Sequence, residues 1–245
     1  MQEHNYPIVL GIARSSNAQN FSGDGKSGLD LKPEIRAKVL ERDDNTCQCC
    51  GFKSQKYQDV FFKNGVPGDK RLDNLGTACI FCHQCFNLDM VNTMRSGVLI
   101  WLPEIDQMTL HHIARAVYVA RISQGPVANA ARQALDVLLA RREQVRSRIG
   151  TDDPYILANV MRDYLGNKHY EMRQKKLEGI RLFPLDRRII READLEFNQF
   201  PQILAYWRSK DGPFGGKIPA QWVDMLIDIR QPQDAPPTSP ADQAA

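Results

Sequence analysis

Two short stretches of the sequence decide the fold: ERDDNTCQCCG, residues 41–51, and DNLGTACIFCH, residues 73–83. Each stretch contains two cysteines with two residues between them; the four are Cys47, Cys50, Cys79 and Cys82. A pair at this spacing can wrap one side of a zinc ion, and two pairs supply the four thiolates of a tetrahedral structural site. The sequence therefore predicts a structural Zn²⁺ site made of these four cysteines.

The spacing of the cysteines alone does not decide which of them are the ligands of this site. All six cysteines of the chain lie between Cys47 and Cys85, which favours metal binding over a disulfide framework. Cys82 and Cys85 have the same spacing as Cys79 and Cys82, so the second pair could shift by three residues. The alternative is that the thiols are buried and pack as small hydrophobic groups. We favour packing only for Cys49 and Cys85.

Length and composition describe an ordinary globular protein. The chain has 245 residues, of which 42% are hydrophobic and 25% charged, and its net charge of +3 is too small to indicate nucleic acid by itself. The most apolar run, residues 97–102, has the length of a strand and stops at Pro103. The N-terminus lacks the pattern of a signal peptide, so we expect a cytoplasmic protein with reduced thiols.

The pattern along the chain predicts an α+β fold with three parts. Residues 1–105 should form an N-terminal strand, at residues 6–13, plus the four-cysteine domain. Residues 106–230 should form a helical region packed on it. Residues 231–245 are rich in Pro and Ala, without bulky apolar residues, and we expect a disordered tail.

Turn and cap residues predict where the individual elements begin. In the first part we expect a helix opened by Pro33, strands near residues 57–63 and 98–102, and a short helix at 79–89. In the second part, helices should begin after Thr109, at Pro126 and at Pro154, the second of them ending at Gly150. A helix over residues 194–209 and a short one after Pro219 complete the prediction.

The cysteine stretches resemble the zinc-containing branch of the HNH (ββα-metal) nuclease superfamily. In that superfamily a helix precedes the first cysteine pair, and an Asn-Leu dipeptide leads into the second pair, which a histidine follows. The sequence Asn74-Leu75, the pair Cys79 and Cys82, and His83 fit this order. The resemblance implies an HNH-like ββα zinc-binding core, covers only about residues 33–95, and is our reason for preferring Cys79 over Cys85.

The same resemblance predicts that no enzyme activity remains. An HNH nuclease needs a histidine at the end of the first hairpin strand, where it acts as general base on a water. Here Asp59 is present, but Val60 or Phe61 stands in the place of that histidine. Loss of a positioned general base costs roughly 10²–10⁴ in rate. We therefore expect no catalytic residues, and a packing or capping role for His83.

The layout as a whole resembles the DotN/IcmJ family of the type IVB (Dot/Icm) secretion system. The resemblance rests on the opening segment at residues 6–15, the cysteine-rich core and the missing histidine; the Pro-rich tail departs from it. It implies a non-enzymatic subunit of the coupling complex at the cytoplasmic side of the inner membrane. Such a subunit binds the C-terminal extension of the coupling ATPase and helps to form the platform that receives effector proteins.

Two other classes of function have some support in the sequence. Residues 168–191 hold eight Lys or Arg against three Asp or Glu, which is the clustering that phosphate contacts need, so a nucleic-acid-binding protein or residual endonuclease is the alternative. We rank it second, because such runs are usually solvated helix faces. The aromatic residues of 197–222 could anchor a protein partner unrelated to secretion, although their spacing also fits the core of a helix.

Overall fold

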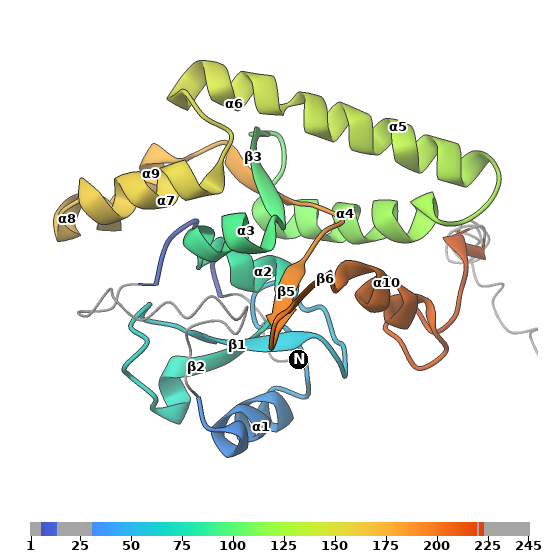
Figure 1. Ribbon diagram of the computed structural model, residues 1–245, viewed down its shortest axis with the longest axis horizontal. Helices are drawn as coiled ribbons and strands as arrows, with labels where there is room; N and C mark the ends of the chain where they lie inside the picture. Colours follow the sequence, from blue (N-terminus) through green and yellow to red (C-terminus); the bar gives the residue numbers. More distant parts are fainter. Residues whose placement is uncertain (1–5, 14–30, 220, 223–245) are drawn as a thin grey trace, which may run out of the picture.

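The described part of the chain combines short antiparallel hairpins with many helices, which confirms the predicted α+β class. The computed structural model describes residues 6–13, 31–219 and 221–222. Three two-stranded sheets lie near a buried four-cysteine cluster, and a long helical region follows in the chain (Figure 1). The predicted tail and nearly all of the short helix after Pro219 lie outside the described residues.

The strands form three antiparallel pairs: β1 (Gln58–Phe62) with β2 (Leu75–Cys79), β3 (Gly97–Trp101) with β4 (Ile180–Pro184), and β5 (Ile189–Glu192) with β6 (Leu195–Asn198). The helices, with the short 3-10 turn η1, are α1 (Pro33–Arg42), η1 (Leu72–Asn74), α2 (Ile80–Cys85), α3 (Leu88–Met94), α4 (Gln107–Arg121), α5 (Pro126–Ala140), α6 (Arg142–Ile149), α7 (Pro154–Asp163), α8 (Asn167–Glu171), α9 (Arg173–Lys176) and α10 (Phe200–Arg208).

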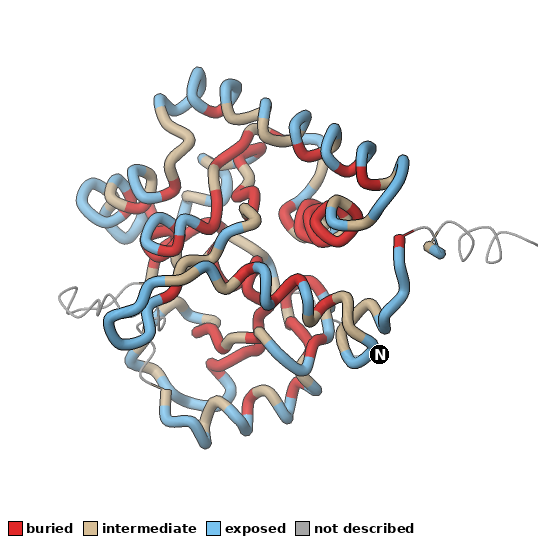
Figure 2. Tube along the Cα trace, turned by 45° about the vertical axis from the view of Figure 1, so that its right-hand side comes forward, coloured by how far each residue is buried: buried red, intermediate tan, exposed pale blue. Residues whose placement is uncertain are grey.

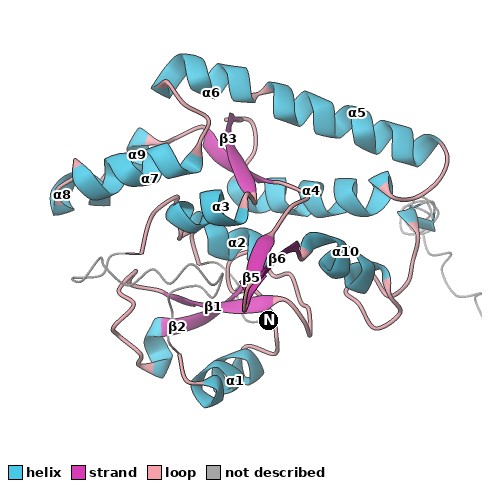
Figure 3. Ribbon diagram, viewed as in Figure 1, coloured by secondary structure: helices cyan, strands magenta, loops and turns pink. Residues whose placement is uncertain are grey.

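The hairpin β1–β2 continues directly into α2, so the cysteine region has the predicted ββα order. Helix α1 begins at Pro33, as expected, and packs Val39 against Val60 and Leu75 of the hairpin. The hairpin and α1 form the lower part of the molecule in Figure 3, whereas most helices lie above it. Cys79 ends β2 and also caps α2, because its sulfur accepts the N–H of Cys82 at 3.4 Å.

Helix α4 is much more buried than α5, which has the same length. Figure 2 shows its turns almost continuously in the colour of buried residues, beneath the half-exposed α5. The helix begins earlier than predicted: Asp106 is the cap, and its carboxylate accepts the N–H of Thr109 at 2.7 Å. Thr109 is therefore not the cap but the residue that the cap binds. One face of α4 points at the cysteine region, and α5 covers the opposite side.

The antiparallel pair β3–β4 joins the N-terminal part of the chain to the helical part. Leu99 of β3 lies opposite Leu182 of β4, and both side chains are completely buried. The predicted helix from Pro126 to Gly150 is instead two helices, α5 and α6, which break at Arg141. At this break the carbonyl of Arg141 accepts the N–H of Trp101 in β3 at 3.3 Å, which attaches the start of α6 to the sheet.

Two further predictions of secondary structure are wrong. Residues 6–13 are not a paired strand; Gly11 donates its N–H to Cys85 O at 2.9 Å and accepts the N–H of Leu88 at 3.0 Å. The predicted helix 194–209 begins only at Phe200, because Ala193 takes a left-handed φ of 54° and turns the chain into the β5–β6 hairpin. No helix within the described ranges is long and apolar enough to cross a membrane.

Candidate metal centre

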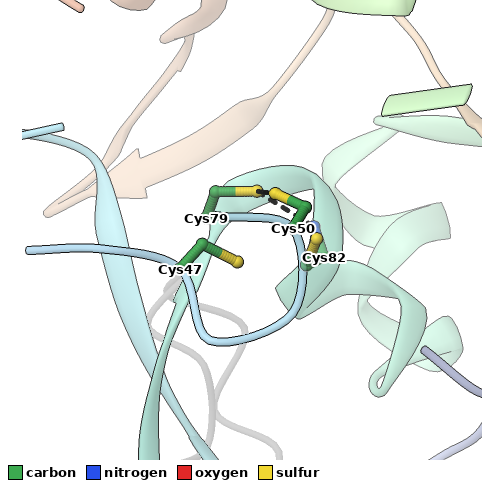
Figure 4. Close-up of side chains that lie close together, drawn as sticks. All are labelled: Cys47, Cys50, Cys79 and Cys82. Carbon is green, nitrogen blue, oxygen red and sulfur yellow. Dashed lines mark hydrogen bonds between the residues drawn. The ribbon is translucent and has the colours of Figure 1, made fainter. Parts of the chain in front are cut away.

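The four predicted cysteines come from three neighbouring structural elements and meet in the core. Cys47 and Cys50 lie in the turn after α1, Cys79 ends β2, and Cys82 lies in the first turn of α2. All four are buried, and their sulfur atoms all lie within 4.8 Å of one another. Figure 4 shows the four side chains pointing toward a common centre.

Short backbone hydrogen bonds hold each cysteine pair in a tight loop. In the first pair, Cys47 donates its N–H to Phe52 O at 3.0 Å, and Gly51 donates its N–H to Cys47 O at 2.9 Å. Gly51 has a φ of 69°, which glycine adopts without steric cost. In the second pair the N–H of Cys82 points at the sulfur of Cys79. Both loops therefore present their sulfurs to the same side.

The spacing and chemistry of the sulfurs fit a tetrahedral metal ion. The Cys50 and Cys79 sulfurs are 3.7 Å apart. With zinc–sulfur bonds of about 2.3 Å, two ligands of a tetrahedral ion lie roughly 3.8 Å apart. Thiolates are the soft ligands that zinc prefers in closed structural sites. The four buried cysteines are therefore placed to bind a metal, and zinc suits the set.

The cluster also receives a buried positive charge from α4. The Nη2 atom of Arg115 lies 2.7 Å from the Cys79 sulfur and 3.4 Å from the Cys50 sulfur. The guanidinium is 2% exposed and lies against the rings of Phe52 and Phe81, at 4.1 and 5.2 Å. Burial alone lowers the pKa of Arg115, but the neighbouring thiols outweigh it and raise the pKa, so the group is charged.

A second residue of α4, His111, contacts the other side of the cluster. Its Nδ1 atom lies 3.3 Å from the Cys82 sulfur. Burial lowers the pKa of His111 well below its usual range, with help from the charge of Arg115, so the ring is neutral. Sequence reasoning missed both residues. Their signal is that two polar side chains, four positions apart, interrupt the buried face of a helix.

The remaining two cysteines differ from the four. Cys85 lies outside the group of mutually close sulfurs; its sulfur points at Phe81 O, 3.5 Å away, and burial raises its pKa well above the usual range. Cys49 is buried beside the cluster, and its hydrogen bond with Cys47 is the main cause of its raised pKa. In contrast, hydrogen bonds from neighbouring thiols outweigh burial at Cys47 and lower its pKa.

The histidine next to the cluster is part of an ion-pair network. His83 is buried, and its Nδ1 atom lies 3.9 Å from the Asp59 carboxylate. Arg36 donates to the same carboxylate at 2.8 Å. Burial raises the pKa of Asp59, but its electrostatic interactions with His83, Arg36 and Arg188 outweigh burial and lower the pKa. Burial lowers the pKa of His83, although Asp59 opposes this.

Four arginines of the basic stretch at residues 168–191 bond to other parts of the protein, three of them in partly buried positions. Arg173 donates to Leu10 O at 3.1 Å, and Arg181 donates to Ile105 O at 2.8 Å. Arg188 donates to the side chain of Gln199, and Arg191 pairs with Glu196. These four side chains hold the N-terminal segment, β4 and the β5–β6 hairpin in place. Much of the local charge excess therefore has a structural explanation.

Comparison with known curated proteins shows a similarity over most of the length of a relative. No family profile matches the chain. The chain is 35% identical over 151 residues to the type 4 apparatus protein DotN of Legionella pneumophila subsp. pneumophila. The alignment covers 60% of this chain and 70% of that protein. The chain therefore belongs to the family of the type 4 apparatus protein DotN.

Proposed function

We propose that the protein is a non-enzymatic structural subunit of a type IV secretion coupling complex. In this proposal it binds the C-terminal extension of the coupling ATPase, on the cytoplasmic side of the inner membrane, and helps to form the surface that recruits effectors. The observation that carries the proposal is the 35% identity to DotN, a type 4 apparatus protein, over 70% of the length of DotN. The assignment of the ATPase tail as the partner goes beyond that name.

The metal part of the proposal assigns structural zinc to Cys47, Cys50, Cys79 and Cys82. The close approach of four buried sulfurs supports it, and so does the buried charge of Arg115 beside two of them. Four protein ligands leave no open position for substrate or water, so zinc here contributes folding free energy instead of catalysis.

Elemental analysis of the purified chain should give about one zinc per chain. Changing Cys79 to Ser should reduce bound zinc to near zero and leave much of the protein insoluble, because a structural site is coupled to folding. Cys85→Ser is the matched control, since Cys85 is equally buried but lies outside the sulfur cluster. Loss of zinc from Cys85→Ser, with zinc kept by Cys79→Ser, would move the second pair by three residues.

The residues around Asp59 support the absence of nuclease activity. A nuclease of the resembled type places a divalent metal and a general base near this carboxylate, but Val60 has no group that can accept a proton. Arg36 donates to the carboxylate, and the charge of Arg188 also acts on it. A divalent cation at Asp59 would therefore be repelled by two positive charges.

We expect no cleavage of plasmid DNA by the purified protein in Mg²⁺ or Mn²⁺. Nicking should stay at the level of a mock preparation, since Val60 cannot act as a general base and Arg36 binds the carboxylate of Asp59. The informative variant is His83→Ala. Metal-dependent nicking that disappears in this variant would show that the site is a working nuclease.

One helix offers an apolar surface for the proposed partner. Ala158 and Met161 on one face of α7 are buried, and α7 packs on α3. On another side Ile156 and Val160 are 48% and 42% exposed, and Tyr164 at its end is 80% exposed. Residues four apart share a face of a helix. We assign this stripe to an amphipathic helix of the ATPase tail, which would cover it with its own apolar side.

Val160→Glu should weaken binding of the ATPase tail by roughly 30-fold or more, about 2 kcal/mol, because it places a charge in an apolar contact. Val137→Glu is the matched control: Val137 is 65% exposed on α5, away from this stripe. The affinity for the ATPase tail should be measured by calorimetry at 50 and 200 mM salt. For the unaltered chain this affinity should change little between the two salt concentrations. Equal effects of the two variants would remove the stripe from the interface. Tight but salt-labile duplex binding, without tail binding, would favour the nucleic-acid alternative.

A further inference from the structure

Helix α4 presents a row of polar side chains to the cysteine cluster, although it belongs to a different part of the chain. Gln107, His111 and Arg115 follow one another at four-residue spacing, so they share one face of the helix. All three are buried. A neighbouring residue, His112, adds a contact between its Nε2 atom and Cys50 O at 3.0 Å. The helix thus touches both cysteine loops.

The hydrogen bonds of Gln107 determine which nitrogen of His111 carries the proton. Gln107 pairs with the backbone of Leu182 in both directions: its oxygen accepts the N–H at 2.9 Å, and its nitrogen donates to the carbonyl at 2.7 Å. The second hydrogen of the amide nitrogen is then directed at His111 Nε2, 2.9 Å away. A neutral imidazole that accepts at Nε2 carries its proton on Nδ1.

It follows that His111 donates a hydrogen bond to the Cys82 sulfur. The sulfur accepts this bond at 3.3 Å, as a thiolate ligand does. Arg115, whose guanidinium can only donate, supplies the corresponding bonds to Cys79 and Cys50. Three of the four sulfurs therefore receive hydrogen bonds from α4.

The charge of Arg115 also indicates that the sulfurs of the cluster are thiolates. Arg115 is buried, and no carboxylate pairs with it among the described residues. Its Nε and Nη1 atoms have no partner there either. A buried, unpaired guanidinium is strongly unfavourable, so the counter-charge must come from the sulfurs. Four thiolates with one Zn²⁺ carry a net charge of −2, which Arg115 reduces to −1.

We propose that Arg115 and His111 are positioning residues for the metal centre, supplied by the helical region. Zinc affinity then depends on the docking of α4, and the docking of α4 depends on zinc, because the coupling between two binding events is reciprocal. The proposal rests on the proposed zinc site. In this proposal the metal centre connects the cysteine region to the helices that pack on that region.

The test compares three variants of the full chain in zinc competition against a chelator. Arg115→Met should weaken zinc binding by about 10- to 100-fold, as is typical for residues that support metal ligands, and Arg115→Lys should restore part of the loss because it keeps the charge. The matched control is Arg121→Met, on the same helix, where the arginine pairs with Asp186 at 2.5 Å. Equal zinc affinities of Arg115→Met and Arg121→Met would overturn the proposal.

A spectroscopic readout separates positioning from general stability. In the cobalt-substituted protein, the sulfur-to-cobalt charge-transfer bands should shift in Arg115→Lys and His111→Gln, because hydrogen bonds to the sulfurs change, but not in Arg121→Met. Unshifted bands in both Arg115→Lys and His111→Gln would overturn the proposal.

Hydrogen exchange of the unaltered chain covers the case in which Arg115→Met does not fold. Removal of zinc by the chelator should reduce amide protection in residues 110–118 of α4 more than in residues 155–163 of α7. Unchanged protection of α4 would contradict the coupling. A chain that binds no zinc at all would overturn the metal centre itself, which is a different result.

Discussion

The contact between the Arg115 guanidinium and the sulfurs of Cys79 and Cys50 is the interaction on which the rest of the structure depends. It places a positive charge in the core, where the described residues offer the cysteine sulfurs and no carboxylate as its partners. The cysteine loops come from the first hundred residues, whereas Arg115 comes from α4, which also packs against β4, α5 and α10. This small site thus acts together with the β3–β4 pairing and the shared apolar core in joining the two regions.

The sequence predicts features that neighbouring residues determine, but not features that depend on contacts between distant parts of the chain. The cysteine spacing, Pro33 and the Asp153-Pro154 start of α7 act within a few residues, and the α+β class follows from them. The hydrogen bond between Arg141 at the break and Trp101 of β3 joins residues forty positions apart, and the β3–β4 pairing joins strands with six helices between them in the chain. Such contacts leave no local pattern. Arg115 and His111 are an intermediate case, because polar residues on a buried helix face signal a buried partner without identifying it.

The surroundings of Asp59 combine a nuclease-like layout with charges that oppose the binding of a cation. The ββα order, the cysteine loops and the Asp59–His83 pair are present, yet arginines lie where a metal-dependent hydrolase needs a cation. A rigid module of this kind suits an apparatus component. The burial that lowers the pKa of His83 comes from the packing of α2 on the β1–β2 hairpin. We propose that the module serves as a scaffold for the helices, and the helices as the surface for the partner.

The most direct test of this account is X-ray absorption at the zinc edge on the purified, unaltered chain. The account predicts a first shell of four sulfurs at about 2.3 Å and no nitrogen, since His111 is a donor to the Cys82 sulfur and not a ligand. A first shell with three sulfurs and one nitrogen at about 2.0 Å would contradict it. In that case a histidine would enter the coordination sphere, and the charge balance that requires Arg115 beside the sulfurs would no longer hold.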